Sequence, residues 1–385
     1  MKRSLSVMLA AAVVSSVFAA PGRAGDRSLV YFGCYTNAKS GSKGIQAAEF
    51  NSATGVLTQP VLAAESMDSP SFLAISPDGK FLYAVGEDGS PGSKSGDVTA
   101  YSISLPGGKL TKLNEQSSKG SGPCHISLDH TGRMAMIANY GGGSVASYAV
   151  GQDGKLSPAV TFVQHTGSSA NASRQSGPHG HSMNPTPDNR FAFACDLGLD
   201  KVIGYKIDPA TGAMTAHSEA KLAPGTGPRH LAFHPNGKFV FVNGEMLMDV
   251  TTFAYDAEKG GLTTLSTAST LPPEDQGKKG LSTAETAVHP GGKFVYVSNR
   301  THDTIAVFSC DQTTGKLTLI QNAPAEGKIP RNFRIDPTGK WMIVAHQDSN
   351  SAAVFKIDPE TGKLTFTGNK VNVGGAVCVR FLPVD

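Results

Sequence analysis

The sequence predicts an all-β fold, a seven-bladed β-propeller whose four-stranded antiparallel blades form a ring closed by the two ends of the chain. Three observations predict it: one turn motif recurs six times, a second recurs seven times in alternation with the first, and the chain ends match complementary parts of one repeat. Repeated units of four short strands are typical of propeller blades. The 44 glycines and 23 prolines among 385 residues agree with many short strands joined by turns.

The first repeat is a turn that carries Gly or Asn and leads into a strand of alternating apolar residues, which is the pattern of a β-hairpin. Its copies begin 47 to 57 residues apart and read SPDGKFLYAV from Ser76, DHTGRMAMIA from Asp129, TPDNRFAFAC from Thr186, HPNGKFVFVN from His234, HPGGKFVYVS from His289 and DPTGKWMIVA from Asp336.

The second repeat is a Gly-x-Leu type of turn that follows a strand such as TIAVFSCD. Its copies are centred on Leu57, Leu110, Leu156, Met214, Leu262, Leu317 and Leu364. Each unit therefore contains a strand, the first turn, a strand, a loop, a strand, the second turn and a last strand.

The chain ends complete the ring. The terminal AVCVRFLPVD aligns with the first strand of a unit, and LVYFGCYT near the start aligns with the second strand. We expect the C-terminal strand to complete the blade that the N-terminal strands begin, which removes the exposed edges of a linear array. The prediction is one domain, residues 28–385. Cys34 and Cys378 fall in this closing blade, which suggests a disulfide that locks the ring.

Residues 1–24 have the organisation of a secretory signal peptide: MKR, the apolar core VMLAAAVVSSVFAA, and small residues before a cleavage site after Ala19 or Ala24. We therefore expect export to the periplasm or the cell exterior, with a retained N-terminal anchor as the rival. No later segment is long enough to span a membrane.

Charge and motif content exclude several classes of function. Without the leader residues Lys2, Arg3 and Arg23 the chain has 31 basic and 31 acidic residues, so nothing indicates nucleic acid or an anionic membrane as a partner. The absence of CxxC and HExxH gives zinc little support, and the absence of GxSxG excludes a nucleophile-elbow hydrolase. We expect neither a metal nor a cofactor.

Polar residues gather where the first strand of each unit begins and where the second ends. These strands are antiparallel, and the first is innermost in a propeller, so both sets should ring one mouth of the central channel. The opposite end of the channel carries the first-repeat turns, and the sequence shows no comparable cluster of polar residues there. This pattern predicts a polar substrate pocket built from several repeats. The residues expected to bind substrate there are His125, Glu285, Arg331, Asn299 and His346.

At this point the sequence resembles a known family. The segments PHGHS, DLGLD, GPRH and SNR, with the repeats above, are similar to the seven-bladed lactonases, which include propeller-type 6-phosphogluconolactonases and fungal carboxymuconate cyclases. The resemblance covers nearly the whole mature chain. It implies catalytic roles for His179 or His181, Arg229, Glu245 and Arg300. NGE, with an extra Gly before Glu245, departs from the family pattern.

The leading hypothesis is metal-independent hydrolysis of a sugar lactone, a carboxylic ester, of the 6-phosphogluconolactone type. Glu245 or a histidine of PHGHS would deprotonate water. Arg229 and Arg300 would stabilise the oxyanion, or hold a phosphate or carboxylate of the substrate. The expected partner is thus a small anionic lactone.

Three alternatives stay open. The first is a cyclase that makes or opens a muconolactone, for which the same set of residues is suited. The second is an exported propeller that binds a ligand without catalysis, since phosphorylated sugars are scarce outside the cytoplasm. The third, a calcium-dependent lactonase, is disfavoured because arginines crowd the predicted site.

Overall fold

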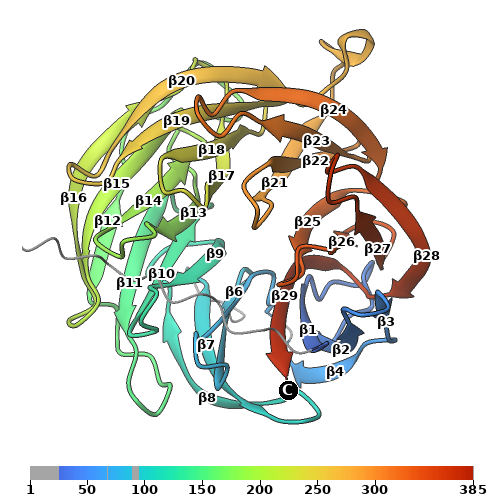
Figure 1. Cartoon of the computed structure of the whole chain (residues 1–385). Helices are drawn as coiled ribbons and strands as arrows, with labels where there is room; N and C mark the ends of the chain where they lie inside the picture. The colour runs from blue at the N-terminus through green and yellow to red at the C-terminus, as the bar shows by residue number, and fades with distance from the viewer. Residues whose placement is uncertain (1–25, 67, 89–94, 385) are drawn as a thin grey trace, which may run out of the picture.

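The computed structural model describes residues 26–66, 68–88 and 95–384, and these form seven antiparallel sheets arranged as a ring (Figure 1). The predicted seven-bladed propeller is confirmed. The predicted signal peptide, residues 1–24, lies outside the described residues.

Six blades share one simple order, in which four consecutive strands pair side by side. The first strand of each blade contacts the first strands of the neighbouring blades, so these strands line the central channel (Figure 1). From the channel outwards the strands are β5 (Leu73–Ile75), β6 (Phe81–Gly86), β7 (Asp97–Ser104) and β8 (Lys109–Ser117); β9 (Pro123–Leu128), β10 (Met134–Asn139), β11 (Ser144–Ala149) and β12 (Thr161–Gln164); β13 (Gly180–Pro185), β14 (Phe191–Asp196), β15 (Lys201–Asp208) and β16 (Ala213–Lys221). The next three blades contain β17 (Pro228–Phe233), β18 (Phe239–Gly244), β19 (Asp249–Asp256) and β20 (Gly261–Ser269); β21 (Ser282–Val288), β22 (Phe294–Arg300), β23 (Thr304–Cys310) and β24 (Leu317–Pro324); β25 (Pro330–Ile335), β26 (Trp341–His346), β27 (Ser351–Ile357) and β28 (Leu364–Asn372). The described residues contain one helical turn, η1 (Pro273–Asp275), between β20 and β21.

The seventh blade joins the two ends of the chain. Its inner strand is β29 (Ala376–Val384), which pairs with β1 (Arg27–Cys34), and β1 pairs with β2 (Gly44–Asn51). Two short strands, β3 (Val56–Leu57) and β4 (Val61–Glu65), pair with the outer side of β2. The predicted closure of the ring is confirmed.

The predicted disulfide between Cys34 and Cys378 is wrong, since all five cysteines are described, free and buried. The pairing register places Cys378 opposite Gly33 rather than opposite Cys34. Cys34 packs into the apolar cluster shared with the sixth blade, whereas Cys378 packs into the cluster shared with the first blade. Side chains on opposite faces of one sheet cannot be bridged by a disulfide.

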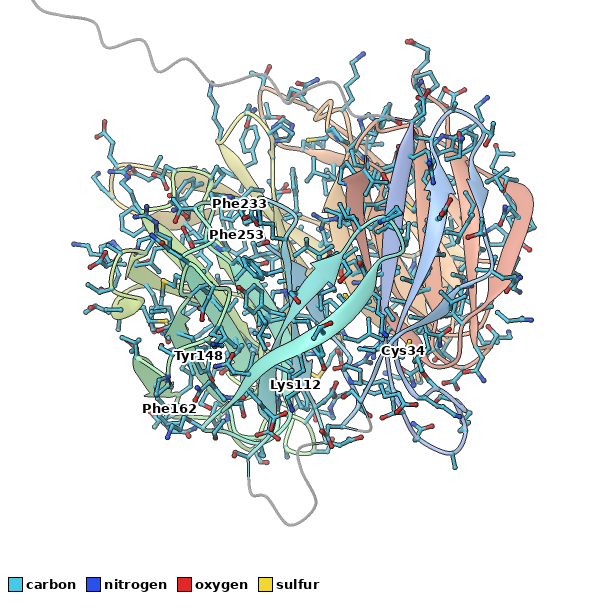
Figure 2. The ribbon with its side chains drawn as sticks, turned by 90° about the horizontal axis from the view of Figure 1, so that it is seen from below. Cys34, Lys112, Tyr148, Phe162, Phe233 and Phe253 are labelled. Atoms are coloured by element: carbon cyan, nitrogen blue, oxygen red, sulfur yellow. The ribbon has the colours of Figure 1, made fainter. Side chains whose placement is uncertain are left out.

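The hydrophobic core fills the spaces between neighbouring sheets, where aromatic side chains such as Tyr148 and Phe253 pack (Figure 2). The second repeat ties these sheets together. The Tyr83 hydroxyl on β6 donates to the Gly154 carbonyl oxygen in the next blade at 2.9 Å, and Tyr31 and Tyr296 bond equivalent turns. Gly154 has a φ of 78°, and an added Cβ would lie 2.2 Å from the Phe81 ring. Only glycine fits so close an approach in the left-handed conformation.

Candidate active site

A β-bulge recurs in the inner strands near the channel end where those strands begin, which we call the loop-side mouth; the end with the first-repeat turns is the turn side. In six blades the register between the inner strand and its neighbour shifts, so that one or two residues of the inner strand are skipped. In a regular strand successive side chains point to opposite faces of the sheet, and a bulge changes the direction in which they point. The skipped residues are Cys124, His181, Arg229 with His230, Ala284 with Glu285, Arg331 and Val377.

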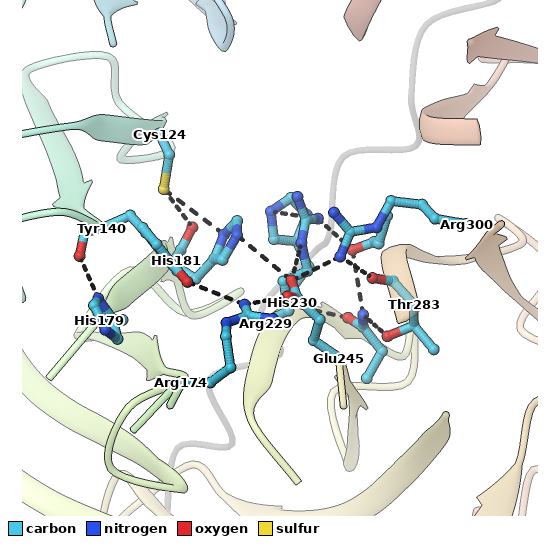
Figure 3. A network of polar contacts seen from close by, with 12 residues as sticks. Cys124, Tyr140, Arg174, His179, His181, Arg229, His230, Glu245, Thr283 and Arg300 are labelled. Carbon is cyan, nitrogen blue, oxygen red and sulfur yellow. Dashed lines mark hydrogen bonds and ion pairs between the residues drawn. The ribbon is translucent and has the colours of Figure 1, made fainter. Parts of the chain in front are cut away.

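Glu245, which directly follows β18, lies at the centre of the loop-side mouth (Figure 3). Its carboxylate oxygens accept from Arg174 Nη2 at 2.7 Å and Arg229 Nε at 3.1 Å, and Arg300 Nη2 lies 2.9 Å away. Burial alone would raise the pKa of Glu245, but Arg300, Arg229 and Arg174 outweigh it and lower the pKa to about 2. The carboxylate is therefore ionised at neutral pH and is a weak base.

His181 is the histidine of PHGHS that faces this carboxylate. Its Nε2 lies 3.9 Å from Glu245 Oε2, and its Nδ1 lies 3.7 Å from Cys124 Sγ. Burial, and next the charge of Arg229, lower the pKa of His181 well below the ordinary value, so the imidazole is neutral. The His179 ring instead stacks on Tyr140 at 4.6 Å and bonds the Tyr140 carbonyl oxygen. Of the two predicted histidines, His181 is therefore the one whose neutral imidazole lies beside Glu245.

A second wall of the mouth carries another buried carboxyl group. Glu87 accepts from the Tyr35 hydroxyl at 3.2 Å and from the Ser71 hydroxyl, and it lines a small pocket with Arg229 and Arg331. Burial raises the pKa of Glu87, and Arg331 opposes that shift only in part. The Arg331 guanidinium lies over the Tyr35 ring at 5.6 Å and forms no hydrogen bond or ion pair within the described residues. Its N–H groups are thus available to an anionic group of a ligand.

Phe72 and His230 divide the channel, because they line both the loop-side pocket and a larger cavity on the turn side. His230 Nε2 lies 3.3 Å from Arg229 Nη1, and His230 Nδ1 lies 3.1 Å from Glu285 Oε1. We predicted His125 and Glu285 at the loop-side mouth. The structure places them on the turn side of this partition, since the bulge sends successive residues of an inner strand to different depths.

The structure does not bring Asn299 or His346 into the cluster around Glu245. Asn299 Nδ2 donates to the Thr270 carbonyl oxygen at 3.1 Å, and His346 Nε2 donates to the Ala325 carbonyl oxygen at 2.6 Å. Both acceptors lie in the loops that lead into the respective blades. Asn299 and His346, at the ends of these second strands, therefore donate to the entering loops.

Arg174 is a site residue that the sequence reasoning missed. It lies in the irregular segment between β12 and β13, outside both repeats, and reaches Glu245 and the Tyr140 hydroxyl. An alignment of the repeats cannot reveal such a residue, because the segment that contains it has no counterpart in the other units. The only sequence signal is an arginine a few residues before PHGHS.

Within the described ranges, no group of three or more His, Cys, Asp and Glu side chains could hold a metal ion. No helix in that part of the chain is both long and apolar enough to cross a membrane.

Comparison with known proteins agrees with the fold. The family model described as "Lactonase, 7-bladed beta-propeller" matches residues 29–381. A 6-phosphogluconolactonase of Bacillus subtilis is 36% identical over 355 residues, covering 91% of this chain and 97% of that protein. A 6-phosphogluconolactonase of Formosa agariphila is 34% identical, covering 80% of this chain and 86% of that protein. The structure of a periplasmic gluconolactonase from Pseudomonas aeruginosa superposes with a TM-score of 0.85 at 32% identity, covering 93% of this chain and 100% of that one.

Proposed function

The chain belongs to the seven-bladed β-propeller lactonase family, and from this premise we propose that it hydrolyses a sugar lactone at the loop-side mouth. The observation that carries the proposal is the buried Glu245 carboxylate, held by three arginines beside the neutral His181 imidazole. Such a site supplies a base and a preorganised positive field, which are the two requirements of ester hydrolysis without a covalent intermediate.

His181 is the proposed base. A water molecule gives its proton to the imidazole as its oxygen bonds to the lactone carbonyl carbon. The tetrahedral intermediate then expels the ring oxygen, which takes the proton back from His181, so the product is the open hydroxy acid. Glu245 is a poor base because its pKa is about 2. Its role is to hold Arg229 and Arg300 where their remaining N–H groups meet the oxyanion.

Arg331 is the proposed anchor for an anionic group of the substrate, because it has no ion-pair partner within the described residues. A planar guanidinium binds carboxylate or phosphate bidentately. A lactone that carries a phosphate or carboxylate would therefore bind more tightly than its neutral analogue.

We also propose that the protein is exported, on the basis of residues 1–24 and the periplasmic gluconolactonase that it resembles. N-terminal sequencing of the mature protein tests this. A start within residues 20–25 supports export, whereas an intact Met1 contradicts it.

The activity is tested by acid release from a panel of lactones: 6-phosphogluconolactone, gluconolactone and a muconolactone. Arg229→Ala should lower kcat/KM by about 100-fold or more, since it removes a donor to the oxyanion. Arg133→Ala, which removes an exposed arginine of the turn side, serves as the matched control. Circular dichroism checks that both variants fold. Equal activity in both variants would contradict the site, and turnover of the muconolactone alone would favour the cyclase.

A further inference from the structure

A large cavity, with a volume of about 720 Å³, lies on the turn side of the partition. Inner strands of all seven blades line it, and Phe72 and His230 separate it from the loop-side mouth. A cavity of this size accommodates a small organic molecule. None of the catalytic roles proposed above uses it.

Two arginines line this cavity, Arg334 on β25 and Arg380 on β29. These two inner strands are neighbours in the ring (Figure 1). Arg334 is exposed within the cavity and forms no hydrogen bond or ion pair with the described residues. Arg380 lies over the Phe72 ring at 4.6 Å, and its Nε and Nη1 donate to the carbonyl oxygens of Leu73 and Val379. The two like charges repel each other: desolvation inside the channel, together with the charge of Arg380, lowers the pKa of Arg334.

The three carboxylates that line the same cavity are already occupied. Glu285 accepts from the Thr286 amide and Asn332, and it pairs with His230. Asp129 and Asp336 accept from backbone amides of their own turns and are almost fully buried. The charge of Glu285 acts on both arginines and offsets part of their charge, but none of these carboxylates forms an ion pair with either guanidinium group.

Thr286 provides an independent observation. This residue lines the cavity, and its hydroxyl oxygen, which has almost no accessible surface, has no hydrogen-bond partner within the described residues. An unsatisfied buried hydroxyl costs free energy unless a ligand or water bonds it. The wall thus combines spare guanidinium donors with an unsatisfied hydroxyl.

We propose that the turn-side cavity is a second binding site, which takes a small oxyanion, a phosphate or a carboxylate, between Arg334 and Arg380. The oxyanion offsets the repulsion between the guanidinium groups and accepts their free N–H groups. The protein walls around the cavity strengthen this attraction, because they exclude part of the screening water. The proposal does not depend on the lactonase activity.

Isothermal titration calorimetry with inorganic phosphate and, separately, with gluconate tests the proposal and distinguishes the two sources of oxyanion. Arg334→Gln removes one guanidinium from the cavity and should weaken binding of the favoured anion about tenfold or more. Lys340→Gln removes an exposed charge from the adjacent turn and should leave the affinity unchanged.

Arg331→Gln addresses the loop-side mouth. If the anion also binds there, the wild type shows two sites, Arg334→Gln loses one, and Arg331→Gln loses the other. The proposal is overturned if neither anion binds the wild type in the millimolar range, or if Arg334→Gln and Lys340→Gln bind it equally.

Discussion

Glu87 and Glu245 occupy corresponding places in two blades, and their surroundings are opposite. Each follows a glycine that ends the second strand of its blade, Gly86 of β6 and Gly244 of β18. Three arginines surround Glu245 and lower its pKa. Burial raises the pKa of Glu87, and the charge of Arg331 and the hydrogen bonds from two hydroxyl groups offset that shift only in part. The repeat therefore fixes where a carboxyl group lies, and the neighbours from other blades and loops fix its protonation.

Glu245→Gln is expected to have the largest effect, since it leaves three arginines around an uncharged amide. Removing one partner of a buried ion-pair network costs about 3–5 kcal/mol of the free energy of unfolding. The rate of lactone hydrolysis should also fall, because the arginines lose the carboxylate that holds them in position. Urea denaturation and initial rates measure both effects. A stability equal to that of the wild type would show that Glu245 does not balance these charges.

Acid pH should remove the contribution of the Glu245 carboxylate to the free energy of unfolding without a mutation. The pKa of the folded state is about 2, below the ordinary value of 4.5, so the contribution is complete above about pH 4.5 and is lost as the pH falls toward 2. The difference corresponds to about 3 kcal/mol. Urea denaturation of the wild type and Glu245→Gln between pH 7 and pH 3 measures it. The two free energies should converge with falling pH, and parallel curves would contradict the assignment.

Arg174→Gln sharpens the comparison by removing the arginine that comes from outside the repeats. The Arg174 side chain is 42% exposed, so solvent screens its pairing with Glu245, and we expect a loss of stability of about 1 kcal/mol or less. A shift of the acid limb of the pH–stability curve toward higher pH should accompany it, because the carboxylate loses one of its three cations. Lys201→Gln, which removes an exposed ion pair with Glu219, is a control that should leave this limb unchanged.

Glu87→Gln should have the smallest effect on the free energy of unfolding, and it should stabilise the protein rather than destabilise it. A carboxyl group whose pKa is raised in the folded state lowers stability as the pH rises above its ordinary value of 4.5. The variant lacks this penalty, so its free energy of unfolding at neutral pH should equal or exceed that of the wild type. A large loss of stability in urea would show that Glu87 is charged and paired in the folded protein.

The fold was predictable because its signals repeat. Glycines such as Gly79 and Gly154 recur where the backbone needs a positive φ, and the ends of the chain match complementary strands of one unit. The family resemblance pointed to Arg229, Glu245 and Arg300, and these residues meet because antiparallel pairing brings strand starts and strand ends to one mouth.

The rest of the site depends on features that no repeat encodes. The bulges place His125 and Glu285 beyond the partition, although strand alignment puts them in the same columns as residues of the mouth. Arg174 lies in an irregular loop. The two glutamates have the same flanking glycine, so only the three-dimensional arrangement of arginines and hydroxyl groups distinguishes their pKa values.

The pairing of β1 with β29 has a consequence for the order of events during synthesis. β1 is among the first strands to leave the ribosome, yet its partner on one side is the last strand of the chain. Until that strand arrives, β1 has an unpaired edge, which can recruit other chains. Among the strand pairs of the described residues this contact has the largest sequence separation, which favours late closure in folding. Until β29 is in place, the seventh blade is open on the inner side of β1.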